Sequence, residues 1–260
     1  MNRRRAILAL CALCALALSA IAASSASAAT KGTTGFTCVE EAGGFTDAHC
    51  KNAGSGNFKH VAIPENTPTE SIVSNDTTNG EKAVERLKAT VAGTALELTA
   101  KLVEGTAVGE NKKDPASGEH YSEAEAKTVF KEVTENLVGC EVVGIPGGAE
   151  TIETKALKAT TKGQGDTGKI SPKEGTVFAE FQLKGCAIAA TYKVVGSLIC
   201  PFTGVTAACT HAETTALKTL RLNSAAGPVV GVEGTGTAKA RAVGSGGPYT
   251  PLSVTTVETP

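Results

Sequence analysis

The chain has 260 residues, a formal net charge of −1 at pH 7 and only 4% aromatic residues, with no tryptophan and Met1 as its sole methionine. Its core must therefore be built mainly from small and branched aliphatic side chains. Beyond Arg5 the basic residues are spread singly among Glu and Asp, which excludes the concentrated positive surface that nucleic acid binding requires.

The N-terminus predicts a secretory signal peptide over residues 1–28. The basic start MNRRR is followed by the apolar run AILALCALCALALSAIAA and by small residues that include Ala26-Ser27-Ala28, an A-x-A cleavage site. A membrane anchor is the alternative, but the run is mostly alanine and lacks the flanks of a spanning helix. No later segment is apolar enough to cross a bilayer. We therefore expect a secreted, extracellular protein with no transmembrane segment in the mature chain.

Removal of this leader takes away two cysteines and leaves six. An even number of cysteines in an exported chain predicts disulfides. The six are Cys38, Cys50, Cys140, Cys186, Cys200 and Cys209. Loop-closure entropy favours bridges between neighbours in the sequence. The expected pairs are Cys38–Cys50, Cys140–Cys186 and Cys200–Cys209, with Cys186–Cys200 as a rival. Each bridge would stabilise the fold by about 2–4 kcal/mol.

Apolar residues alternate in several runs along the mature chain. The runs are TALELTAKLV (94–103), TVFAEFQLKG (176–185), TALKTLRLN (215–223) and LSVTTVET (252–259). This period of two, bounded by Gly, Pro, Asn and Asp, is typical of strands with one face in water. Strands at this spacing without alternating helices predict an all-β fold, an antiparallel β-sandwich.

The same pass along the chain suggests how the strands are grouped. A disulfide-stapled segment over 29–62 would precede two β-lobes, over 63–148 and 149–260, which divide near the turn GIPGG. The length also suits the alternative of one large β domain over 63–260.

One segment, YSEAEAKTVFKEVTENL (121–137), carries a competing helix pattern. Ser122 and Glu125 have the spacing of a capping box, and apolar residues recur every four positions from Val129. The same segment also alternates well enough to form a strand. The sequence therefore allows at most one short helix, near 122–137.

Two short patches resemble loops of trypsin-like serine proteases. TDAHC resembles the catalytic-histidine loop, which a Cys38–Cys50 bridge would close, and VGSGGP resembles the nucleophile loop. The resemblance implies His49 as the general base and Ser245 as the nucleophile. However, Gly244 stands where that family has an acidic residue, and no candidate for the orienting carboxylate is clear. We therefore interpret the two cysteines as a structural bridge and assign no catalytic residue.

Metal and cofactor motifs are weak. A zinc site would use Cys38, Asp47, His49 and Cys50. The paired C-x2–4-C spacing of structural zinc sites is missing from the mature chain, and an oxidising compartment favours disulfides. The glycine-rich stretches GTGT and GSGG lack the lysine-containing ending of a phosphate-binding loop. We therefore predict no metal and no cofactor. The other histidines are expected at the surface: His60, His120 and His211.

Several longer stretches are similar to a family of uncharacterised secreted proteins from soil actinobacteria. They are GFTC with FTDAHC, LVGCEVVG, ALKATTKGQG, GTVFAEFQLKGC with YKVVGSLIC, and YTPLSVTTVET. The resemblance covers most of the mature chain and implies an all-β fold, with a strand rather than a helix over 128–143. It implies no activity, ligand or catalytic residue.

These observations predict a secreted, disulfide-stabilised, non-enzymatic β-sandwich protein with a structural or binding role outside the cell. Its partner would be a component of the cell envelope or an extracellular ligand. One alternative is a secreted hydrolase with an unrecognised site. Another is a module that binds glycans or small ligands, for which the rings of Tyr121 and Tyr192 would form the platform.

Overall fold

The computed structural model describes residues 31–258 except 48–49, 51, 62, 76, 79–80, 83, 165–166, 204–205, 208–219, 234–235 and 248. Within these residues the chain forms antiparallel strands and no helix, which confirms the predicted all-β sandwich. It follows that no helix in this part of the chain is long and apolar enough to cross a membrane.

The strands follow one another along the chain with short connections. They are β1 (Lys31–Phe45), β2 (Ala53–Val61), β3 (Thr69–Asn75), β4 (Thr77–Thr78), β5 (Glu81–Lys82), β6 (Glu85–Val91), β7 (Thr94–Lys113), β8 (His120–Glu135), β9 (Glu141–Gly144), β10 (Gly148–Ala149), β11 (Thr151–Glu153), β12 (Leu157–Thr160), β13 (Thr167–Pro172), β14 (Val177–Lys184), β15 (Ala190–Gly196), β16 (Leu198–Thr203), β17 (Thr206–Ala207), β18 (Leu220–Leu222), β19 (Val230–Glu233), β20 (Gly236–Ala242) and β21 (Thr250–Glu258).

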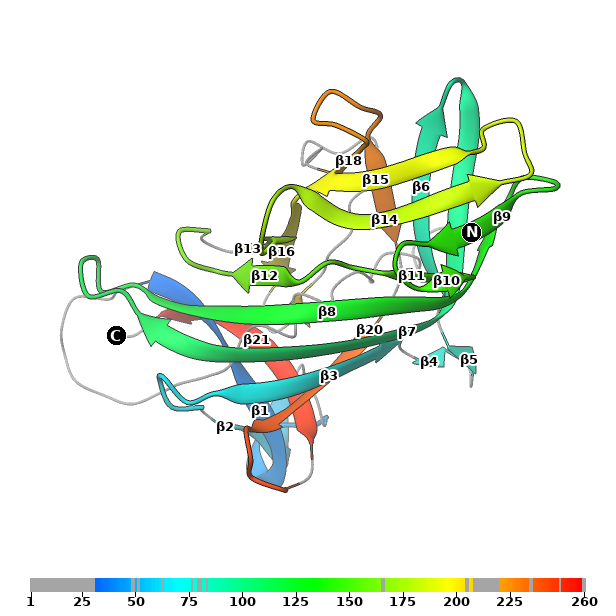
Figure 1. Cartoon of the computed structure of the whole chain (residues 1–260). Coiled ribbons are helices and arrows are strands. Elements are labelled where there is room, and N and C mark those ends of the chain that lie inside the picture. Colours follow the sequence, from blue (N-terminus) through cyan, green and yellow to red (C-terminus); the bar gives the residue numbers. More distant parts are fainter. Residues whose placement is uncertain are drawn as a thin grey trace, which may run out of the picture.

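Among the described residues, the strands form a 14-stranded sheet, a five-stranded sheet and the two-stranded β4–β5 ribbon. The large sheet runs β17-β16-β13-β12-β8-β7-β3-β20-β21-β1-β2, with β11 paired to β8, β6 to β7 and β19 to β6. The small sheet runs β10-β9-β14-β15-β18. In Figure 1, β9, β14 and β15 lie above the long β7–β8 pair, and β1, β20 and β21 lie below it.

Strand β8 is the segment whose sequence fitted both a helix and a strand. β7 pairs with one edge along almost all of its length, and β12 and β11 pair with the other edge. These ladders satisfy the backbone on both sides, so tertiary pairing overrides the local helix pattern. Ser122 is fully buried in the sheet instead of capping a helix, and Ala124, Ala126 and Thr128 alternate with exposed residues behind it.

Strand β7 changes its neighbour halfway along. Its first half pairs with β6 and its second half with β3, on the edge that β8 does not use. The buried side chains change phase at the same place, from Leu96, Leu98 and Ala100 to Val103 and Ala107. A strand that bends between two directions in this way is how sandwiches make a corner. Figure 1 shows β6 rising steeply from the direction that β3 follows.

Asn75 at the end of β3 bridges this corner. Its Nδ2 donates a hydrogen bond to the carbonyl of Lys101 at 2.9 Å, and its Oδ1 accepts one from the N–H of Val103 at 2.6 Å. The side chain thus takes the place of a paired strand residue exactly where β3 has ended and β6 has not yet begun to pair.

The main hydrophobic core draws on both sheets. β14 contributes Phe178, Phe181 and Leu183, and the large sheet contributes further apolar residues such as Leu157 and Ile170. Alanine is frequent in this core, as the composition predicted. A second, smaller cluster surrounds the N-terminal cysteines and is described below.

The predicted boundaries cross the observed sheets. β11, β12 and β13 belong to the 149–260 segment, yet they extend the sheet that contains β7 and β8 of the 63–148 segment. The N-terminal segment joins the same sheet, because β1 pairs with β21 from Lys31↔Glu258 to Thr37↔Leu252. The division of the chain into domains stays a prediction.

Candidate functional site

The outer face of the large sheet gathers charged side chains over β7, β8 and β12. Successive residues of a strand point to opposite faces, so Glu110 and Lys112 share the outer face of β7, as Glu123 and Glu125 share that of β8. The strand register sets Glu110 directly opposite Glu123. Two like charges at such a position repel one another, so the pair needs compensation.

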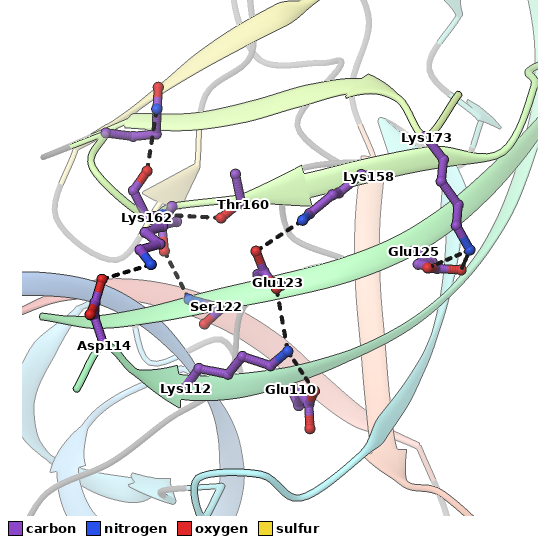
Figure 2. Close-up of polar contacts among 12 residues, drawn as sticks. Glu110, Lys112, Asp114, Ser122, Glu123, Glu125, Lys158, Thr160, Lys162 and Lys173 are labelled. Atoms are coloured by element: carbon purple, nitrogen blue, oxygen red, sulfur yellow. Dashed lines mark hydrogen bonds and ion pairs between the residues drawn. The ribbon is translucent and has the colours of Figure 1, made fainter. Parts of the chain in front are cut away.

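Lysines supply this compensation from positions one row away. Lys112 Nζ lies 2.9 Å from Glu110 Oε1 and 3.3 Å from Glu123 Oε2. The other oxygen of Glu123 lies 3.1 Å from Lys158 Nζ of β12. Figure 2 shows Lys112 reaching between the two carboxylates and Lys158 approaching from the neighbouring strand. The four side chains form one continuous chain of ion pairs across three strands.

Lys173, just after β13, continues the pattern. Its Nζ lies 2.6 Å from one oxygen of Glu125 and 2.7 Å from the other. Together with the chain of ion pairs, Lys173 and Glu125 line a surface groove of about 480 Å³, to which Pro68 and Val108 add apolar surface. Val108 is 53% exposed although it lies in the middle of a strand.

One end of this face is closed by contacts between two hairpin tips. Asp114, between β7 and β8, lies 2.6 Å from Lys162 of the β12–β13 turn. In the same pair of turns, the N–H of Gly163 donates to Glu119 Oε1 at 2.8 Å. Lys162 also lies 5.1 Å from the centre of the Tyr121 ring. These contacts fix the two tips relative to each other (Figure 2).

The pKa shifts in this groove favour the charged forms. Partial burial opposes ionisation of Glu123, but hydrogen bonds from Lys158 and Lys112 outweigh it and lower the pKa of the carboxyl. The hydrogen bond to Glu110 raises the pKa of Lys112. Likewise Lys162 lowers the pKa of Asp114. A general acid or base needs a pKa near the working pH, and each of these shifts leads away from it.

The disulfide predictions are confirmed where the structure describes both cysteines. Cys38 is bonded to Cys50, and Cys140 to Cys186. The rival pair Cys186–Cys200 is therefore wrong. Cys209 and the side chain of Cys200 lie outside the described residues, so their pairing stays a prediction.

The cystine decides against the zinc ligand set. Cys38 and Cys50 are 2% and 0% exposed, and each sulfur is already bonded to the other. Neither is therefore available as a thiolate ligand. Asp47 Oδ2 accepts a hydrogen bond from the N–H of Asn52 at 2.7 Å, which braces the loop. In the part of the chain that is described, no group of three or more His, Cys, Asp or Glu side chains is placed to hold a metal.

Of the two residues in the protease-like patches, the structure describes one. Ser245 is exposed in the turn after β20, where its Oγ accepts a hydrogen bond from the N–H of Gly247 at 3.3 Å. This is the local bond of a serine turn, which needs no catalytic partner to explain it. His49 lies outside the described residues.

The two tyrosines expected to form a ligand platform are core residues. Tyr121 is 9% exposed and Tyr192 is 4% exposed, so neither ring offers a face to a sugar. Tyr192 stacks on Phe181 with ring centres 5.5 Å apart, and its hydroxyl donates to the carbonyl of Ile188 at 2.6 Å. Burial raises the pKa of Tyr192.

The prediction for His60 needs correction. Its ring is partly buried between Phe36 and Phe45, with ring centres 3.6 Å and 4.1 Å away. Burial lowers the pKa of His60, and a hydrogen bond with the carbonyl of Cys50 at 3.4 Å offsets this only in part. His120 lies beside Glu65, with Nδ1 2.8 Å from Oε1. His211 lies outside the described residues.

The charged groove was not predicted. The spacing Glu-x-Lys at 110–112 and Glu-x-Glu at 123–125 was a usable signal once both segments were taken as strands. The register that sets Glu110 against Glu123, and the arrival of Lys158 from a third strand, depend on long-range pairing that no local pattern contains.

Comparison with known proteins adds no family. No family model matches the chain, and neither a curated protein nor a solved structure matches it significantly. The resemblance to secreted actinobacterial proteins stays a prediction. What the protein does must therefore be argued from its own geometry.

Proposed function

We propose that the protein works outside the cytoplasm as a non-enzymatic structural or binding component. The observation that carries this proposal is the pair of disulfides, Cys38–Cys50 and Cys140–Cys186, within an all-β fold. The cytosol keeps thiols reduced, whereas exported proteins form and retain disulfides. The leader expected over residues 1–28 would provide the route.

The first disulfide is an integral part of the packing. Cys38 and Cys50 are the buried centre of the second hydrophobic cluster, together with Phe36, and Phe45 and Phe58 pack against them. A thiol pair left reduced at this position would lose the restriction that the bond places on the unfolded chain, worth about 2–4 kcal/mol. An oxidising compartment is therefore the environment in which this sequence is most stable.

The groove supports a role other than catalysis. Its carboxylates and ammonium groups are paired with one another, and the pKa shifts keep Glu123 ionised and Lys112 protonated. Such a face suits contact with a partner, because ion pairs exposed to water are weak and exchange readily.

Export is tested by expressing the full chain with a C-terminal tag in a Gram-positive secretion host. We expect the culture medium to hold a chain that starts after residue 28 and does not react with a thiol reagent unless it is first reduced. A variant with Ala26→Lys and Ala28→Lys should be cleaved poorly, because the A-x-A site is lost. Retention of the natural chain in the cytoplasm with free thiols would contradict the proposal.

The non-enzymatic part is tested separately on the purified mature protein. We expect no turnover on a panel of peptide, ester, phosphate and glycoside substrates. A fluorophosphonate probe should not label Ser245, and Ser245→Ala is the matched control. Labelling that disappears in this variant, or hydrolysis that follows the protein through purification, would favour a hydrolase.

A further inference from the structure

A cavity lies between the two sheets, away from the charged groove. It has a volume of about 70 Å³. The small sheet contributes Phe178 and Phe181, and the bent end of the large sheet contributes Leu98, Phe130 and Val133. Carbon atoms line it almost completely, because its polar neighbours, Glu85 among them, present their hydrocarbon parts.

The cavity exists because small residues face it at the corner of the sandwich. Ala100 of β7 and Ala179 of β14 are buried and line it from the two sheets. At Ala100 the buried phase of β7 ends, and the strand bends away. The walls therefore diverge at a place where no large side chain fills the space.

Water is a poor occupant of this cavity. The volume exceeds the roughly 10–15 Å³ that one water needs, but a buried water also needs two to four polar partners. The lining offers almost none. Apolar cavities of this kind stay dry and take up apolar molecules, as an engineered cavity of about 150 Å³ takes up benzene.

We propose that this cavity is a binding site for a short alkyl group of a small molecule. At about 70 Å³ it has roughly half the volume of the engineered benzene site, so it favours an alkyl group over an aromatic ring. It is too small for the acyl chain of a membrane lipid. Arg86, Leu87 and Phe130 are only partly buried, so the cavity lies close to the surface there and the rest of a ligand can extend outward.

This inference goes beyond the proposed extracellular role, because that role rests on the disulfides and does not require a ligand. The two can therefore fail independently. An empty cavity would leave the export and oxidation results unchanged.

The first experiment uses the natural mature protein with xenon and with the n-alcohols from ethanol to hexanol as probes. Methyl NMR should show saturable shifts confined to the lining residues Leu98, Val133, Val194 and Leu220. Thermal stability should rise with alcohol chain length up to the length that fills the cavity, by roughly 3–5 °C at tenfold excess over the Kd.

The second experiment fills the cavity by substitution. Ala100→Val and Ala179→Val add methyl groups from opposite sheets, and either should weaken xenon binding by about tenfold or more. Ala95→Val is the matched control, because Ala95 is an exposed residue of the same strand as Ala100 and does not line the cavity. It should bind xenon as the natural chain does.

Two results would overturn the proposal. One is the absence of saturable xenon or alcohol shifts at the lining methyls of the natural chain, a measurement that needs no variant. The other is binding that both filling variants leave intact. If one filling variant fails to fold, the other and the methyl shifts still decide the matter.

Discussion

Asn75 shows how one side chain can hold a strand together where its neighbours change. The backbone groups of Lys101 and Val103 lie between the part of β7 paired with β6 and the part paired with β3. Without the Asn75 amide, one carbonyl and one N–H would lose their partners close to the core. Buried backbone groups are almost always paired, so this residue performs a structural duty that only an amide of this length can meet.

We expect Asn75→Ala to lower the free energy of unfolding by about 2–4 kcal/mol, since each buried group left unsatisfied costs about 1–3 kcal/mol. Urea denaturation at constant m-value measures this loss. Asn57→Ala on the exposed side of β2 is the control, and surface substitutions of that kind usually stay within about 0.5 kcal/mol. A loss at Asn75 no larger than in the control would show that the corner is held by other contacts.

His60 should make stability depend on pH. Burial between Phe36 and Phe45 lowers its pKa in the folded chain, so the folded state disfavours the charged ring. The associated stability is fully present above the unfolded pKa of about 6.5 and is lost as pH falls through the lower folded pKa.

This pH dependence can be isolated by comparison with His60→Phe, which keeps a ring of similar shape and removes the titration. The difference in unfolding free energy between the natural chain and the variant should shift against the natural chain as pH falls from about 7.5 to 5. Carboxylates contribute equally to both proteins and cancel. A constant difference over this range would mean that the imidazole is not desolvated as the structure indicates.

The elements differ in how much the sequence could say about them. Alternation located strands in the regions of β7, β14 and β21, and cysteine count with loop entropy gave two of the bridges. β8 was ambiguous, because Ser122 and Glu125 carry a helix signal whose rejection depends on pairing at both edges. The groove was missed for the same reason, since its ion pairs join strands that are distant in the sequence.

The two disulfides should differ in their susceptibility to reductants. Cys140 and Cys186 lie in the turns after β8 and β14 and are partly exposed, whereas Cys38 and Cys50 are buried. Exchange requires a reductant to reach a sulfur atom. Under native conditions, timed reduction followed by alkylation and mass spectrometry should therefore label Cys140 and Cys186 first.

The contrast should vanish in urea, where both bridges are equally accessible, and this comparison is the internal control. Labelling of Cys38 and Cys50 at the same native rate as the other pair would mean that the N-terminal cluster opens locally without unfolding the rest.

At the scale of the whole molecule, the order of strands in the large sheet departs far from their order in the chain. β1 at the beginning pairs with β21 at the end, and β3 pairs with β20. Such non-local pairs pay loop-closure entropy before their contacts form, so the fold depends on its two ends meeting. Apart from β2, β21 is the strand that hydrogen-bonds to β1 in the described part of the chain.

Ending the chain at Tyr249 removes β21 and should therefore release the N-terminal hairpin while the β7–β8 pair persists. Amide hydrogen exchange of residues 33–37 should accelerate strongly, because these residues face β21 in the ladder. Amides in the middle of β8 should remain protected, since β7 and β12 still flank them. A chain ending at Glu258 keeps every β1–β21 pair and serves as the control. Unchanged protection at 33–37 in the shorter chain would mean that packing of β1 on β8, and not the meeting of the two ends, anchors the hairpin.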